Sequence, residues 1–106
     1  MSRYYPVFID VKDRRCVVIG GVNEGQKNVE KLLGSGADVV VISPEVNPLV
    51  EHRAESGEVA WIRRGYETGD LEDTFIAIAA TDDNSVNLQI AKEAEERNVL
   101  LNVVDV

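Results

Sequence analysis

The chain has very little of what metal centres and disulfide-stabilised proteins need. Its 106 residues include one cysteine, Cys16, and one histidine, His52. A single cysteine excludes an intrachain disulfide and a cysteine-cluster metal site, and the apolar neighbours Val17–Ile19 predict a buried strand thiol. His52 has no cysteine or carboxylate at clear ligand spacing, which favours an exposed helical residue over a ligand. We therefore predict no metal site.

Positive charge and long apolar runs are also scarce. The 11 Lys and Arg residues are scattered among 19 Asp and Glu residues, which gives a formal net charge of −8, whereas a sequence-independent nucleic-acid surface needs clustered cations. No apolar run approaches the ~20 residues of a membrane span, and the amino terminus lacks the basic-then-apolar order of a signal peptide. These absences predict a cytoplasmic protein that binds neither nucleic acid nor membrane.

The apolar residues occur as short runs rich in Val and Ile, separated by polar segments of helix length. This rhythm is typical of an α/β protein with a buried parallel sheet. Right-handed crossovers make a Rossmann-type doubly wound sheet the simplest topology, in one domain over residues 1–106 with a hydrophobic content of 44%. The predicted strands are Cys16–Gly20, Asp38–Ile42, Val59–Ile62, Phe75–Ala79 and Val99–Val103, after an extended lead-in at Val7–Val11.

The polar segments predict three helices and a loop. Glycine, proline and capping residues supply the start and stop signals. In the third helix, charged residues from Glu93 to Arg97 are expected to face water. The segments are a helix ending at Gly34–Gly36, a second helix whose start is framed by Pro44 and Pro48 and which runs to about Ser56, a loop at 65–73, and a helix from about Asn84 to Arg97 capped by Asp83.

A glycine-rich turn, Gly20-Gly21-Val22-Asn23-Glu24-Gly25, follows the first predicted strand and leads into a helix. This is the context that a dinucleotide-binding turn requires, with Gly20 suited to the tight turn and Gly25 to close packing of helix on strand. Val22 stands where the fingerprint has its middle glycine and restricts the approach of a pyrophosphate, while Glu24 opposes an anion at the helix terminus. The turn predicts a weakened dinucleotide site; the alternative is a plain strand-to-helix connection.

The tip of the second predicted strand reads Ser43-Pro44-Glu45. NAD-binding proteins often place an acid at this position for the ribose hydroxyls, so Ser43 or Glu45 is suited to the ribose. The absence of an adjacent Arg or Lys favours NAD over its 2′-phosphorylated form. A role for Ser43 as the cap of the next helix remains the alternative.

Four segments together resemble one known family. In order and spacing they are similar to the precorrin-2 dehydrogenase domain of siroheme synthases, and the similarity covers essentially the whole chain. The most specific part is the pairing of Ala-Ala-Thr-Asp-Asp at the fourth strand with Asn-Val-Val-Asp at the fifth. The segments are Tyr5–Val11, Arg15–Gly21, Ala79–Asp83 and Asn102–Asp105.

This resemblance implies NAD-dependent oxidation of the tetrapyrrole precorrin-2 to sirohydrochlorin in siroheme biosynthesis, with insertion of ferrous iron in some members. The family's key carboxylate falls on Asp105, and further cofactor contacts fall on Thr81 and Asp82. Loss of a hydride to the nicotinamide also requires loss of a proton, and a carboxylate at a strand tip is suitably placed to accept it. The alternatives are that Asp105 merely ends a strand and that Asp82 and Asp83 are helix-capping residues.

The chain departs from the family pattern in two places. The family usually has three consecutive glycines where this chain has Gly20-Gly21-Val22. Family members also continue well beyond Asp105 into a dimerisation region and a helical domain, which are absent here. The resemblance thus implies a homodimer for full-length members and leaves the assembly of this chain open. The alternative function is a non-catalytic nucleotide-sensing or interaction module with the same fold.

Overall fold

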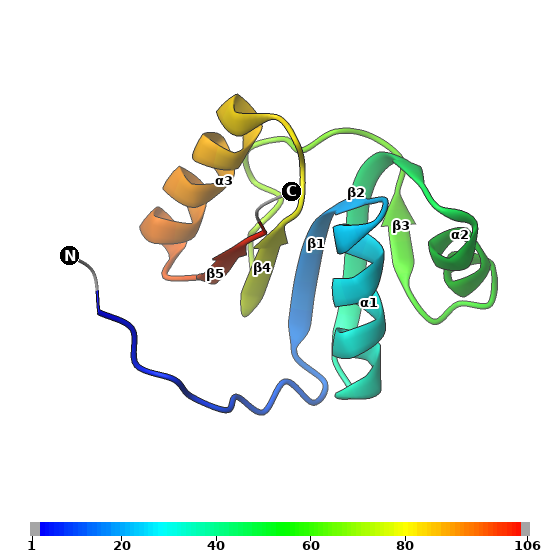
Figure 1. Ribbon diagram of the computed structural model, residues 1–106, viewed down its shortest axis with the longest axis horizontal. Coiled ribbons are helices and arrows are strands. Elements are labelled where there is room, and N and C mark those ends of the chain that lie inside the picture. The colour runs from blue at the N-terminus through cyan, green and yellow to red at the C-terminus, as the bar shows by residue number, and fades with distance from the viewer. Residues whose placement is uncertain (1–2, 105–106) are drawn as a thin grey trace.

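The computed structural model describes residues 3–104, which form a five-stranded sheet and three helices (Figure 1). Every strand pair in the sheet is parallel, which confirms the predicted α/β class. The elements in chain order are β1 (Arg15–Gly21), α1 (Glu24–Gly34), β2 (Asp38–Val46), α2 (Pro48–Glu55), β3 (Ala60–Ile62), β4 (Ile76–Ala79), α3 (Asn84–Arg97) and β5 (Leu100–Val103).

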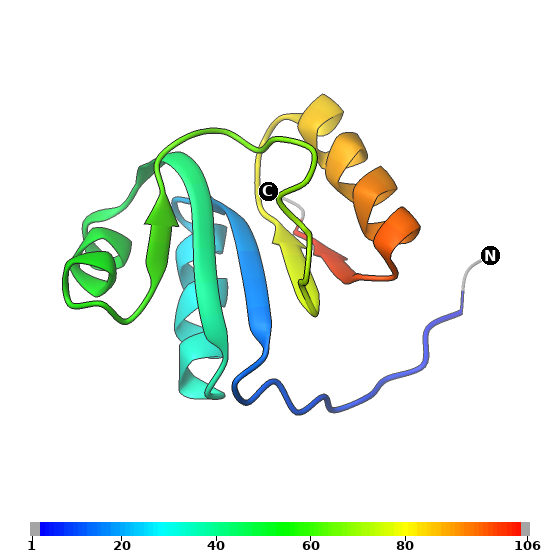
Figure 2. The same ribbon diagram turned by 180° about the vertical axis from the view of Figure 1, so that it is seen from behind.

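The strand order is β3-β2-β1-β4-β5, as in a Rossmann-like doubly wound sheet. The chain builds outward from β1 to β3 on one side and then returns to place β4 on the other side of β1. The connection from β3 to β4 arches over the carboxyl ends of β2 and β1 and then descends in front of β4 (Figure 2). A crevice therefore opens at the carboxyl ends of β1 and β4, where the direction of winding reverses.

Apolar side chains on both faces of the sheet are buried, which explains why β1 is almost continuously hydrophobic. Alternate residues of a strand point to opposite faces. Cys16 and Val18 pack in the cluster that contains Val29 of α1 and Val50 of α2, and Figure 1 shows α1 in front of β1 and β2. Ile19 packs in the other cluster, which α3 and the β3–β4 connection cover.

The sequence predicted the end of β2 wrongly. The strand continues through Ser43, Pro44 and Glu45 to Val46, which pairs with Gly21 after a shift in register. Proline is tolerated where a strand bulges, so Pro44 does not end this one. The second helix accordingly starts only at Pro48.

The capping of α2 and α3 follows ordinary side-chain chemistry. The Asn47 Oδ1 atom accepts from the Val50 amide at 3.0 Å, so Asn47 and not Ser43 caps α2. The bounds and the Asp83 cap of α3 are confirmed. The expectation that Glu93 faces water is wrong, because it is only 3% exposed.

Most of the lead-in before β1 does not pack on the sheet. Residues 3–10 form no helix or strand and run away from the sheet in an extended course (Figure 1). Tyr4, Tyr5 and Phe8 are almost fully exposed, and burial begins at Val11. None of the helices described is both long and apolar enough to cross a membrane.

Candidate functional site

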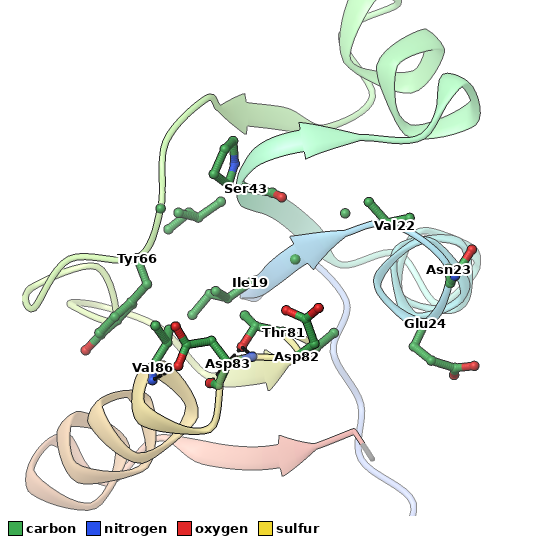
Figure 3. A pocket seen from close by; sticks show the side chains of 16 residues that line it. Ile19, Val22, Asn23, Glu24, Ser43, Tyr66, Thr81, Asp82, Asp83 and Val86 are labelled. Atoms are coloured by element: carbon green, nitrogen blue, oxygen red, sulfur yellow. Dashed lines mark hydrogen bonds between the residues drawn. The ribbon is translucent and has the colours of Figure 1, made fainter. Parts of the chain in front are cut away.

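A pocket of about 490 Å³ opens at the crevice beyond the carboxyl ends of β1, β2 and β4 (Figure 3). A volume of this size suits a small-molecule ligand. Four segments supply its walls: the glycine turn after β1, the bulged part of β2 (residues 43–45, where the register shifts), the β3–β4 connection, and the turn from β4 into α3. All but one of the cofactor residues proposed from the sequence line it, namely Gly20, Gly21, Val22, Asn23, Glu24, Ser43, Pro44, Thr81 and Asp82.

The glycine turn has the shape that the sequence predicted. Gly20 has a φ of +102°, and a Cβ atom there would lie 2.5 Å from the carbonyl oxygen of Ala80. A Cβ atom on Gly25 would overlap the carbonyl of Gly20, because α1 packs directly against the end of β1. A side chain at Gly20 would push the turn away from Ala80, and one at Gly25 would push α1 away from the end of β1.

The amino terminus of α1 differs from those of the other two helices. Side chains of Asn47 and Asp83 cap α2 and α3, whereas no side chain caps α1. The Gly25 amide donates to the Val22 carbonyl at 2.9 Å, so an anion at the pocket would meet the other amides of the first turn, together with the positive end of the helix dipole. Glu24 adds negative charge there, but Lys27 pairs with it at 2.9 Å.

Val22 stands on the α1 side of the pocket, across from Tyr66 (Figure 3). Its side chain is 49% exposed, and its backbone φ is not positive. A β-branched residue therefore fits the turn without backbone strain, even though the fingerprint prefers glycine. The cost of Val22 lies in the space that its side chain takes from a ligand.

The bulged part of β2 contributes one of its two expected ribose contacts to the pocket. Ser43 is 6% exposed, and its hydroxyl donates to the carbonyl oxygen of Glu45. The indole Nε1 of Trp61 donates to the Ser43 carbonyl at 2.9 Å and holds this backbone in place. Glu45 is exposed and does not line the pocket. The structure thus brings Ser43 to the pocket and leaves Glu45 outside it.

The two carboxylates in the turn from β4 into α3, those of Asp82 and Asp83, have different surroundings. Asp83 accepts from Ser85 Oγ at 2.7 Å and from the Ser85 amide at 2.9 Å. These bonds, and one from the Val86 amide, lower the pKa of Asp83. Asp82 is exposed at the pocket. Capping therefore accounts for Asp83, and Asp82 faces the pocket without forming part of the cap.

Thr81 is fixed by the first turns of α3. Its hydroxyl donates to Asn87 Oδ1 at 2.7 Å, and Asn87 Nδ2 donates to the Thr81 carbonyl at 3.1 Å. This pair of bonds sets the direction in which the chain leaves β4. The residue expected to carry the chemistry, Asp105, lies outside the described residues. Within them, no group of three or more His, Cys, Asp or Glu is arranged to hold a metal ion.

Sequence reasoning missed the wall formed by the β3–β4 connection. Gly65 and Tyr66 line the pocket from a segment without helix or strand. The segment has no periodicity to mark a buried side, and the aromatic Tyr66 was the available signal. Ile42 and Val86 add apolar surface near Tyr66.

Comparisons with known proteins agree with this geometry. A family model described as "Putative NAD(P)-binding" matches residues 7–106. Siroheme synthase 1 of Serratia proteamaculans is 35% identical over 102 residues, which are 96% of this chain and 21% of that protein. The siroheme synthase of Photobacterium profundum is 40% identical over 102 residues, with 96% and 22% covered. The chain spans about a fifth of the length of these relatives.

A solved structure has the same arrangement of elements. It is SirC, a precorrin-2 dehydrogenase, with a TM-score of 0.82 and 27% sequence identity. The match covers 93% of this chain and 48% of that one. The fold, the open crevice at its glycine turn and the family model across residues 7–106 together establish that the chain belongs to this family of NAD(P)-binding domains.

Proposed function

We propose that the pocket binds NAD and that the chain is the cofactor domain of a precorrin-2 dehydrogenase acting in siroheme biosynthesis. The observation that carries the proposal is the uncapped amino terminus of α1 directly behind the glycine turn. A pyrophosphate at this point would accept hydrogen bonds from first-turn amides that no side chain caps. The siroheme synthase relatives and the SirC neighbour support the choice of reaction.

The residues of the pocket fit a dinucleotide in a definite order. The pyrophosphate would lie along Gly20–Glu24, with a ribose beside Ser43 and Pro44 and the turn Thr81–Asp82 across the crevice. Glu45 would need to swing toward the pocket to take part in ribose binding. Bound NAD would supply a hydride acceptor.

The absence of positively charged side chains from the described pocket lining supports a preference for NAD over the 2′-phosphorylated cofactor. Neither Lys nor Arg occurs among the pocket-lining residues within 3–104. A 2′-phosphate on the adenosine ribose is usually met by an arginine near the end of β2. The pocket therefore favours a cofactor with free ribose hydroxyls.

The chemical step is proposed through Asp105, two positions beyond the last residue of β5. Oxidation of precorrin-2 transfers a hydride to the nicotinamide and releases a proton, which the Asp105 carboxylate would accept. For a full-length member of the family, the resemblance extends the proposal to a homodimer and to insertion of ferrous iron as a second substrate.

Calorimetric titration with NAD, with the 2′-phosphorylated cofactor as comparator, tests the cofactor proposal. We expect saturable binding that is tighter for NAD. Gly20→Val should abolish it, because the added side chain displaces the turn from Ala80. Gly34→Ala is the matched control, since nothing lies within 4 Å of a Cβ atom there. Absence of binding up to millimolar NAD in the unmodified chain would contradict the proposal.

The variant Val22→Gly probes the departure from the glycine fingerprint. Removing the side chain should tighten NAD binding, because the backbone can then approach the pyrophosphate more closely. Unchanged affinity would show that Val22 does not obstruct the ligand. An assay of precorrin-2 oxidation in the longest form of the protein tests the reaction itself, and NAD binding without oxidation would support the nucleotide-sensing alternative.

A further inference from the structure

One buried carboxylate organises the pocket wall that faces Val22. Glu93 lies in α3 and is only 3% exposed, among the apolar residues that α3 packs on the sheet. A buried charge is costly unless it is fully hydrogen-bonded, so a glutamate at this position needs several donors. The segment 65–71 and α3 itself supply them.

Glu93 accepts four hydrogen bonds. The hydroxyl of Tyr66 donates to Oε1, and the amide of Gly69 donates to the same atom at 3.1 Å. The amide of Leu71 donates to Oε2 at 3.2 Å, and Arg97 Nε donates to it at 2.7 Å. Three of these four donors belong to the segment that forms the pocket wall.

The protonation states of the pair fix the direction of the bond from Tyr66. Burial works to raise the pKa of Glu93, but the bonds from Tyr66, Gly69, Arg97 and Leu71 together lower it. Burial and the adjacent Glu93 raise the pKa of Tyr66. At neutral pH the phenol therefore donates to a carboxylate, which holds the aromatic ring in one orientation at the pocket.

Two further anchors make the same segment rigid. Both terminal nitrogens of Arg64 donate to the carboxylate of Asp70 at 2.8 Å, and Asp70 also accepts from the Glu67 amide at 2.7 Å. Leu71 is fully buried in the core beneath α3. A segment without helix or strand is thus tied down at each end of its pocket-lining part.

Tyr66 stands at the apolar end of the pocket. The turn before α1 lies opposite, while Ile19 and Val86 lie toward the side of Tyr66 (Figure 3). Ile42 and Pro44 also line the pocket. If the pyrophosphate binds at α1, the base attached to the ribose at β2 extends toward this apolar side. The adenosine half of a dinucleotide is the half held by the first three strands of such a sheet.

We propose that Tyr66 forms the wall against which the adenine ring of the dinucleotide packs, and that Glu93 is the positioning residue that holds Tyr66 there. This inference rests on the proposed NAD binding and adds a specificity determinant for its adenine end. Packing of two aromatic rings gives an affinity gain of roughly tenfold. Disturbing the wall should therefore weaken ligands that contain adenine and spare those that lack it.

The experiment compares three ligands by calorimetry: NAD, AMP, which carries the adenine end, and nicotinamide mononucleotide, which lacks it. In Glu93→Gln and Tyr66→Ala we expect affinity for NAD and AMP to fall about tenfold, with that for nicotinamide mononucleotide unchanged. Tyr66→Phe keeps the ring and should lose less. The matched control is Glu30→Gln, which breaks the ion pair with Arg53 between α1 and α2, away from the pocket.

The outcomes separate the inference from the function on which it rests. If the unmodified chain binds NAD and AMP but Glu93→Gln and Tyr66→Ala match Glu30→Gln, the inference is wrong and the proposed function stands. An equal loss for all three ligands would also overturn it, because the wall would then act on the whole site. If Glu93→Gln does not fold, Tyr66→Ala carries the test by the same criterion. Failure of the unmodified chain to bind any of the ligands would overturn both proposals.

Discussion

At Gly25 the backbone of α1 approaches β1 so closely that no side chain fits between them. We predict that Gly25→Ala lowers the free energy of unfolding by about 2 kcal/mol, the usual cost of forcing extra volume into a packed site. Gly34→Ala has open space at the end of the same helix and should raise stability by roughly 0.5–1 kcal/mol. Urea denaturation followed by Trp61 fluorescence measures both. Equal effects of the two substitutions would show that helix propensity, and not the close approach, governs Gly25.

At the level of residues, the sequence predicted those whose role is local and missed those whose role depends on distant partners. The tight turn at Gly20 follows from its position between a strand and a helix, so spacing alone was sufficient. Glu93 has the spacing of a solvent-facing residue, yet the amides of residues 69 and 71 require an acceptor beneath them. Nothing local to α3 carries that information.

Among the elements, the stability that the β3–β4 connection gains from its hydrogen bonds to Glu93 depends on pH. The pKa of Glu93 is lowered in the folded protein, so this stabilisation is complete above the ordinary glutamate pKa of about 4.3 and is lost as the pH falls below that value. We predict that the free energy of unfolding decreases below about pH 4.3 and that Glu93→Gln reduces this decrease. Asp70 and Asp83, whose pKa values are also lowered, contribute the remaining slope.

Denaturation curves at a series of pH values, recorded in parallel for Glu30→Gln, measure the contribution of Glu93. Glu30→Gln should keep the slope of the unmodified chain. A slope that Glu93→Gln leaves unchanged would mean that Glu93 is not ionised in the folded state.

The bounds of the elements show the same limit of sequence reasoning. For α3, an apolar stripe and the capping residue Asp83 marked both its start and its end. For β2, Pro44 indicated a stop, but the pairing of Val46 with Gly21 carries the strand past it. Strand ends depend on the neighbouring strand, which a single sequence does not display.

In the whole molecule, the position of the pocket follows from the strand order. Because β2 and β4 both flank β1, the glycine turn lies between two neighbouring strand tips and a ligand can reach all three. Ligands of doubly wound sheets bind beyond the carboxyl ends of the strands, and nine of the ten cofactor residues expected from the sequence line the pocket there. The sequence could not predict that β2 continues past Pro44 in such a way that Glu45 lies outside the pocket while Ser43 lines it.

Because β1 lies in the middle of the sheet, the rate at which Cys16 reacts with a thiol probe reports how often the entire fold opens. Its thiol is fully buried, and burial raises its pKa. A thiol-reactive probe should therefore label the native chain only when the sheet opens, at a rate far below that of the unfolded chain. Saturating NAD should slow labelling further, in proportion to one plus the ratio of ligand concentration to Kd. Labelling at the unfolded rate would mean that β1 is readily accessible. Because the chain has no second cysteine, mass spectrometry of a single modification would follow both folding and cofactor occupancy without any engineered label.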